Sequence, residues 1–319
     1  MKTLDGLRHT PSWITHMGCL SGCIHYLNLP ITDSWLYGAT GHAFVINISR
    51  DSCPSGPTAW KTMEFFRLGK NAGYTIDGVF AHKSMPDFKE KQRQAYDHVK
   101  QAIDAGHPCY GWELEVPEFY NIHGYDDQGY HYKGPGSPDG KGPKPWQELG
   151  DTGIGVVEVY SVAPGTPASP EVTLWESLQF ALEHAQGPDK WIFPNYTSGP
   201  AAYDTWTAGI EDASASRDGI AYNAQCWHEC RGHAAAFLEE AKAVLPNLTP
   251  QLETARAHYA SVAEGLRELT EIYPFNLPPD YDKLIEEDAR QQLAIDALQN
   301  SKEAEEAGLD ALLGILDEL

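Results

Sequence analysis

The 319-residue chain changes in character near Pro170, and this change constrains its fold more than any single motif. Before Pro170, short apolar runs of strand length alternate with segments rich in glycine, proline and aromatic residues. After it, apolar residues recur at helical spacing over long stretches, and the final one carries the stripe Leu309, Leu312, Leu313 and Leu316. We therefore expect an N-terminal α+β domain over residues 1–165 and a helical domain over residues 166–319.

Periodicity and turn residues predict the individual elements. In the first domain we expect helices over residues 19–29, 60–72 and 86–105. The strands expected there cover residues 43–48, 73–81, 109–114, 118–123, 130–132 and 155–162, with a turn over 124–129 and a loop over 134–145. In the second domain we expect helices over residues 173–186, 199–211, 221–245, 249–272 and 281–319.

Composition excludes several classes of function. A formal net charge of −22 argues against a nucleic-acid or anionic-membrane partner, since either needs clustered Lys and Arg. No apolar run approaches the roughly 20 residues of a membrane span. The first residues lack the apolar core of a secretion signal, so the six cysteines are expected as reduced thiols in a cytoplasmic protein. Phosphate-loop, dinucleotide-binding and GxSxG motifs are absent, and no cofactor is expected.

The stretch HMGCLSGCIH, residues 16–25, places Cys19 and Cys23 on one face of the expected helix. A redox pair normally has CxxC spacing, and a zinc site needs a second pair of ligands. Both thiols can also be plain core residues, because free cysteine is among the most buried residue types. Core packing, a metal site, a redox pair and a nucleophile are the four interpretations.

Position favours a nucleophile at Cys19, which follows Gly18 where the helix is expected to begin. The unpaired N–H groups of a helix start stabilise a thiolate and can hold an oxyanion. Cys23, one turn further along, is expected in the core. The segment EFYNIHGYDDQGYHY predicts strand, turn and strand, which brings His123, Asp126 and Asp127 to one strand end, where sites are built.

Four segments in order, GCLSGCIHYL, LYGATGHAFVINIS, AIDAGHPCYGWEL and FYNIHGYDD, resemble the N-terminal family of butirosin-biosynthesis protein H. That family is related to the C39-like branch of the papain fold, and the resemblance covers residues 13–165. The C-terminal segments GPAAYDTWTAGIED and WHECRGHAAAFLEEA resemble the accessory region of the family. The resemblance implies a papain-like domain with Cys19 at the start of the central helix. It also implies acyl chemistry through a cysteine thioester, as an acyltransferase or as a peptidase-like hydrolase.

The chain departs from the family pattern at the base. In C39-like proteins a histidine begins the strand that leads into the Gly-Tyr-Asp turn, and here Glu118 stands at about that place. His123 lies just before the turn, with side-chain parity opposite to that of Glu118. No glutamine precedes Cys19 as an oxyanion donor. His123, another histidine (His107 or His42), or no working base therefore remain as alternatives.

Other groups of residues suggest further sites. Cys226, Cys230 and His233 share a helical face and could hold a metal, but they fit helix packing better, and no metal site is expected. His42 lies in the glycine-flanked loop GATGHAF, which the family resemblance places near the site, so it is a candidate substrate contact. Glu118 and Trp112 are the other candidate substrate contacts.

These observations predict a papain-like thiol enzyme in which Cys19 attacks, His123 acts as base and Asp126 orients the imidazole. It would carry out acyl transfer or amide hydrolysis on a small-molecule or acyl-carrier-bound substrate in secondary metabolism. The same fold as a non-catalytic binding module is the alternative, and Glu118 in place of the family histidine favours it.

Overall fold

A computed structural model describes residues 1–277, 281 and 286–319 of the chain. It contains two compact units, which we describe separately. The sheet unit comprises Met1–Ile31 and Gly73–Pro167, and the helical unit comprises Thr32–Ala72 and Ala168–Leu319. Residues 32–72, which we expected in the first domain, therefore pack with the helical unit.

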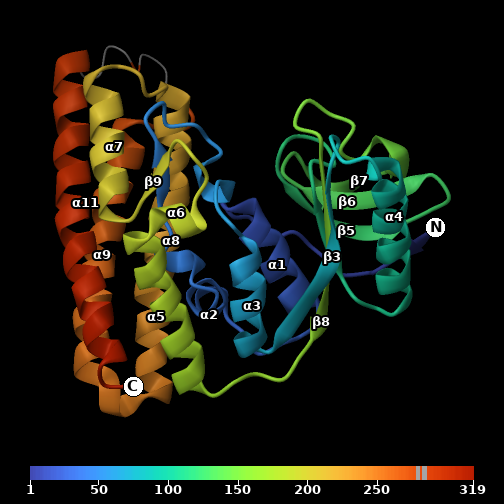
Figure 1. Ribbon diagram of the computed structural model, residues 1–319, viewed down its shortest axis with the longest axis horizontal. Helices are drawn as coiled ribbons and strands as arrows, with labels where there is room; N and C mark the ends of the chain where they lie inside the picture. The colour runs from blue at the N-terminus through green and yellow to red at the C-terminus, as the bar shows by residue number, and fades with distance from the viewer. Residues whose placement is uncertain (278–280, 282–285) are drawn as a thin grey trace. The chain divides into compact units, whose positions relative to one another are not determined.

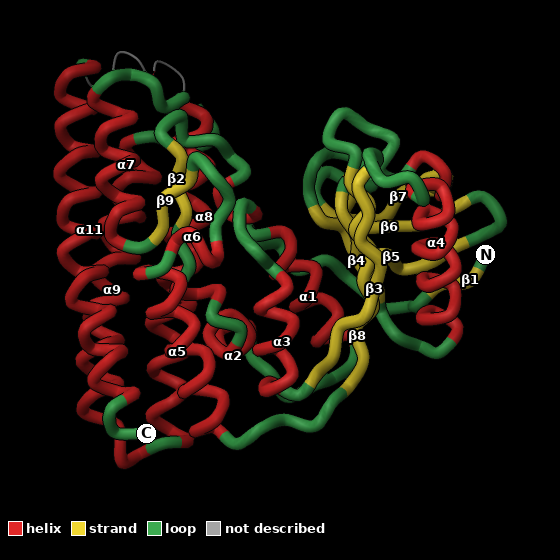
Figure 2. Tube along the Cα trace, in the orientation of Figure 1, coloured by secondary structure: helices red, strands yellow, loops and turns green. Residues whose placement is uncertain are grey.

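The sheet unit is built on a seven-stranded antiparallel sheet with the order β3-β8-β4-β5-β6-β7, and β1 pairs with β5 beyond the end of β4 (Figure 2). Its strands are β1 (Lys2–Thr3), β3 (Tyr74–His82), β4 (Cys109–Trp112), β5 (Phe119–Tyr125), β6 (Gly129–Gly134), β7 (Ser137–Pro145) and β8 (Val156–Pro164). Its helices are α1 (Thr15–Tyr26), α4 (Phe88–Asp104) and the 3-10 turn η3 (Trp146–Glu148).

The two helices of the sheet unit cover opposite faces of the sheet (Figure 1). On the α1 face, the His16 ring stacks on Phe119 with ring centroids 3.9 Å apart, and its Nε2 lies 3.1 Å from the Tyr110 hydroxyl. On the α4 face, Nε2 of His98 lies 3.0 Å from the Ser161 hydroxyl. Because side chains alternate along a strand, β5 directs Phe119 and Asn121 toward α1.

The prediction of a loop over residues 134–145 is wrong, because most of this segment forms the edge strand β7. An edge strand needs ladder hydrogen bonds on one side only, so it tolerates Pro138, Pro143 and Pro145. Register shifts between β6 and β7 accommodate the irregular backbone. The remaining strand predictions of this unit are confirmed within a few residues, including the turn before β6.

The helical unit contains long helices and a two-stranded antiparallel sheet of β2 and β9 (Figure 2). Its elements are α2 (Asp33–Ala39), η1 (His42–Phe44), β2 (Asn47–Ser49), η2 (Gly56–Thr58), α3 (Met63–Ala72), α5 (Pro170–Gln186), α6 (Pro188–Trp191), β9 (Tyr196–Ser198), α7 (Pro200–Glu211), α8 (Arg217–Val244), η4 (Pro246–Leu248), α9 (Thr249–Ile272) and α11 (Glu287–Leu316). The helix expected over 281–319 is confirmed from Glu287 onward, and its residues 282–285 lie outside the described residues. Within the described part of the chain, no helix has the length and apolarity that a membrane span requires.

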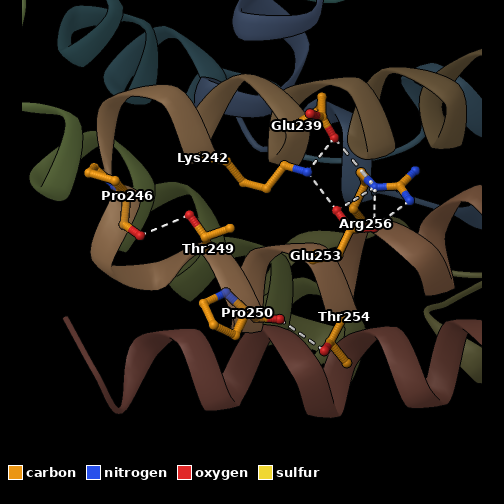
Figure 3. Close-up of polar contacts among 8 residues, drawn as sticks. All are labelled: Glu239, Lys242, Pro246, Thr249, Pro250, Glu253, Thr254 and Arg256. Atoms are coloured by element: carbon orange, nitrogen blue, oxygen red, sulfur yellow. Dashed lines mark hydrogen bonds and ion pairs between the residues drawn. The ribbon is translucent and has the colours of Figure 1, made fainter.

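The turn between α8 and α9 is tied by charged side chains (Figure 3). Nζ of Lys242 lies 2.6 Å from Glu239 and 2.5 Å from Glu253, which is also 2.6 Å from Arg256. Thr249 donates to the carbonyl of Pro246 over 2.8 Å and so closes the turn. Exposed ion pairs of this kind contribute about 0–1 kcal/mol each to folding stability. They therefore orient the side chains of the turn but stabilise it only weakly.

A fully buried ion pair organises the centre of the helical unit. Nε and Nη2 of Arg231 lie 2.7 and 2.8 Å from the two carboxylate oxygens of Glu305, and neither side chain is exposed. Nη1 of Arg231 donates to the carbonyls of Ala43 and Val45, at 2.9 Å each. The prediction of a strand over residues 43–48 is therefore wrong over most of its length. The carbonyl groups that would pair with a neighbouring strand accept hydrogen bonds from the Arg231 side chain instead.

Candidate functional site

The central helix begins earlier than its sequence indicates. α1 starts at Thr15, and the Gly18 N–H already donates to the Ile14 carbonyl over 3.0 Å. Cys19 thus lies in the second turn, beyond the free N–H groups of the helix start. The expectation that Cys19 opens the helix and uses its N–H groups is wrong.

Gly18 and Gly22 instead form a groove for the backbone of the N-terminal segment. A Cβ at Gly18 would lie 2.4 Å from the Thr10 carbonyl oxygen, and one at Gly22 would lie 2.1 Å from that of Arg8. The Thr10 N–H donates to the Gly18 carbonyl over 3.3 Å. Only glycine allows this approach, so the spacing of the two glycines holds residues 8–10 against α1.

This packing brings His9 to Cys19. Sγ of Cys19 lies 3.5 Å from Nδ1 of His9. Nδ2 of Asn121, on β5, donates to the Cys19 carbonyl over 2.8 Å and lies 3.4 Å from Sγ of Cys23. A thiol, an imidazole and a carboxamide therefore meet where the N-terminal segment crosses α1.

Burial keeps the thiol and the imidazole neutral. The Cys19 side chain is 0% exposed, and burial, then Cys23, then Glu118 raise the pKa of its thiol well above the ordinary value. Burial lowers the pKa of His9, and its interaction with Asn121 offsets part of this effect. Burial thus favours a thiol beside a neutral imidazole over the preformed thiolate expected from helix position.

Glu118, which precedes β5 and for which the resemblance implied a histidine, contacts the first residue of α1. Its Oε2 accepts a hydrogen bond from the Thr15 hydroxyl over 2.5 Å, and the Phe119 N–H donates to that same hydroxyl over 3.1 Å. Its negative charge contributes to the raised pKa of Cys19. Glu118 therefore disfavours a thiolate, in contrast to the imidazolium that a histidine would provide.

The structure does not bring His123 and Asp126 together with Cys19. The His123 ring lies beside His131, with centroids 6.4 Å apart, and burial followed by the charge of Lys133 lowers its pKa to about 4. Oδ2 of Asp126 lies 2.7 Å from Nε2 of His131, and its Oδ1 accepts two turn N–H groups. Across the described residues, neither side chain forms a hydrogen bond with Cys19.

The two remaining predicted substrate contacts lie in different units. Trp112 ends β4 on the α1 face of the sheet, with its ring centroid 5.0 Å from that of Phe119. His42 belongs to the helical unit, where its Nδ1 lies 3.7 Å from Sγ of Cys230. His42 is fully buried, and burial is the largest cause that lowers its pKa to about 4.

The possible metal ligands on α8 do not converge. Cys226 and Cys230 are buried, whereas Nδ1 of His233 lies 3.1 Å from the Ser34 hydroxyl and its ring stacks on Tyr37. The described residues contain no group of three or more His, Cys, Asp or Glu side chains that could hold a metal ion.

An open pocket of about 760 Å³ adjoins the Cys19–His9 pair. The N-terminal segment forms one wall, and the β6–β7 hairpin forms the other. Its lining residues are Arg8, His9, Pro11, Ser12, Lys133, Gly134, Pro135, Gly136, Pro138 and Asp139. His9 thus both lines the pocket and contacts the buried thiol.

Sequence reasoning missed His9 because it precedes the first periodic element, in a segment without helical or strand pattern. The usable signal was the i, i+4 spacing of Gly18 and Gly22, which indicates that another backbone approaches the helix. No protein-family model matches the chain, and no curated protein is significantly similar to it.

Proposed function

We propose that the sheet unit is a cysteine-dependent acyltransferase or amide hydrolase in which Cys19 is the nucleophile and His9 its general base. The observation that carries the proposal is the 3.5 Å contact between Sγ of Cys19 and Nδ1 of His9, with His9 also lining the pocket. A thiol and an imidazole at this distance can exchange a proton during attack. Asn121 is a positioning residue for the pair.

The neutral resting state defines the order of proton transfer. His9 takes the thiol proton as Sγ attacks the substrate carbonyl, so thiolate and imidazolium form together. The tetrahedral intermediate then expels the leaving thiol or amine, which receives that proton from His9. The acyl group remains on Cys19 as a thioester. In the second half-reaction, an amine or water attacks the thioester and His9 accepts the proton of the attacking group. The Cys19 sulfur is then expelled and takes this proton from His9, which regenerates the thiol.

A papain-like fold is part of the proposal. It is supported by the family resemblance of residues 13–165 and by α1 packing on one face of an antiparallel sheet. The base differs from that of the family, because Glu118 replaces the histidine and His9 comes from the segment before α1. The substrate is a small or carrier-bound acyl compound. Residues 168–319 of the helical unit correspond to the accessory region of the family, whereas Thr32–Ala72, which packs with them, belongs to the resemblance of residues 13–165.

A non-catalytic binding module of the same fold is the second candidate. It is favoured by the complete burial of Cys19 and by the negative charge of Glu118 near the thiol. In this function the pocket binds a ligand and the Cys19–His9 contact is structural. The two functions differ in whether Cys19 ever carries an acyl group.

Acyl-enzyme trapping tests the proposal. The full-length protein is incubated with the acetyl thioester of N-acetylcysteamine and then analysed by intact-mass and peptide mass spectrometry. We expect an acetyl adduct on Cys19 that is absent in Cys19→Ser and reduced in His9→Gln. Acetylation of surface lysines alone, with Cys19 unmodified, would contradict the enzyme and favour the binding module. Cys23→Ser is the matched control and should retain the adduct.

A further inference from the structure

The pocket beside Cys19 contains two cations that lack acidic partners. Among the described residues, neither Arg8 nor Lys133 lies within ion-pair distance of a carboxylate. Lys141, on the same hairpin, is by contrast paired with Glu115. In a chain of net charge −22, where acidic groups are abundant, the two unpaired cations give this one pocket two positive groups.

The backbone around these cations is held in place. The Arg8 carbonyl lies in the groove at Gly22, and Nζ of Lys133 donates to the Leu7 carbonyl over 3.4 Å. Prolines 11, 135 and 138 line the pocket and restrict the flexibility of its walls. Arg8 and Lys133 thus line the same pocket from its two restrained walls.

We propose that this pocket is an anion-binding subsite, in which Arg8 and Lys133 hold a carboxylate or phosphate group of the substrate beside His9. This inference rests on the proposed function and names the substrate class, which is an acyl or amide compound that carries a negative group. Arg8 offers a planar fork of donors and Lys133 a point charge, and both are suited to oxygen anions. Asp139, which also lines the pocket, limits its net positive charge and disfavours unselective binding of polyanions.

Anion binding would also act on the reacting pair. A negative group near His9 favours its charged form and so opposes the effect of burial. The imidazolium that forms during attack by Cys19 is then stabilised by the substrate itself. A neutral substrate of the same size lacks this contribution.

Equilibrium binding tests the subsite without requiring turnover. We would titrate sodium succinate and, separately, inorganic phosphate at constant ionic strength into full-length Cys19→Ser protein labelled with ¹⁵N. We expect saturable shifts of backbone signals at residues 8–9 and 133–136. Arg8→Gln and Lys133→Gln should each weaken binding about tenfold. Lys89→Gln removes an exposed cation on α4 outside the pocket and should leave binding unchanged.

The outcomes separate the subsite from the reaction. Tighter binding of succinate identifies a carboxylate substrate, and tighter binding of phosphate identifies a phosphorylated one. Absence of saturable shifts, or equal weakening by Lys89→Gln, overturns the subsite even if Cys19 forms an acyl adduct. Localised anion binding without any acyl adduct supports the subsite and assigns it to the binding-module function.

Discussion

Gly22→Ala should displace the N-terminal segment that carries His9 from α1. The new Cβ would lie 2.1 Å from the Arg8 carbonyl oxygen and 3.2 Å from Oδ1 of Asn121. The first distance is far inside van der Waals contact, and a backbone oxygen cannot rotate away as a side chain can. The segment must therefore move away from the helix or strain it.

The magnitude combines two opposing contributions. Overpacking costs about 1–3 kcal/mol, and the backbone clash places this variant near the upper end. Alanine in place of glycine in a helix interior contributes about 1 kcal/mol in the opposite direction. We therefore expect the free energy of opening at α1 to fall by about 2 kcal/mol.

Native-state hydrogen exchange followed by mass spectrometry measures this change for each helix separately. Gly232→Ala on α8 is the matched control, because a Cβ there would meet no atom within 4 Å. This variant should raise the free energy of opening of α8 by up to about 1 kcal/mol, so that exchange in α8 becomes slower. In Gly22→Ala, peptides of α1 should exchange faster.

Slower exchange at α1 in Gly22→Ala, comparable to the effect of Gly232→Ala on α8, would refute the reasoning. It would mean that residues 8–10 do not lie in the groove. The contact between His9 and Cys19 would then lose its structural basis.

Three further predictions concern other side chains. Arg231→Met leaves Glu305 buried and unpaired, so it should lower the free energy of unfolding by about 3–5 kcal/mol in urea denaturation; a loss below 1 kcal/mol would contradict the prediction. Burial lowers the pKa of His42 to about 4 and that of His184 to about 3, so the unfolded chain, with values near 6.5, binds protons that the folded chain does not. Stability should therefore be full above pH 6.5 and fall as the pH drops toward 4, by about 3 kcal/mol for each histidine. His184→Leu should flatten the dependence of Tm on pH, and an unchanged slope would contradict this account. Cys53 is half-buried; burial raises the pKa of its thiol, but hydrogen bonds outweigh this effect and lower the pKa. Cys53 should therefore react with iodoacetamide faster than the buried cysteines, which peptide mass spectrometry can check.

Much of the fold could be predicted because its signals are local. Strand β3 and helices α5, α7, α8 and α9 follow apolar periodicity bounded by proline or glycine, and their predicted bounds differ from the observed ones by a few residues. The strand β7 escaped prediction because its prolines and glycines are typical of loops, and pairing with β6 overrides that preference.

The long-range contacts could not be predicted from the sequence. Residues 32–72 join the helical unit because α2 packs against α8, where a Cβ at Gly38 would lie 1.9 Å from the Phe237 ring. Nothing in the sequence near Gly38 indicates a partner almost 200 residues away. His9 is a different case, since the spacing of Gly18 and Gly22 indicates that a backbone approaches α1 but not that residues 8–10 supply it.

The candidate site was therefore predicted only in part. Cys19 is retained as the proposed nucleophile, although its helix position and protonation state differ from those expected. His123 remains a prediction from its place at a strand end before the turn. The register shift between β5 and β6 after Ile122 shows that the strand is irregular there. The geometry favours His9, whose ring contacts the thiol.

The alkylation rate of Cys19 tests the central claim most directly. It is measured with iodoacetamide near neutral pH in a Cys53→Ser background, by peptide mass spectrometry of the native protein. We expect His9→Gln to lower this rate about tenfold or more, because it removes the proton acceptor, and His123→Gln to leave it unchanged. An unchanged or faster rate in His9→Gln would show that His9 only covers the thiol, and would contradict its role as the base.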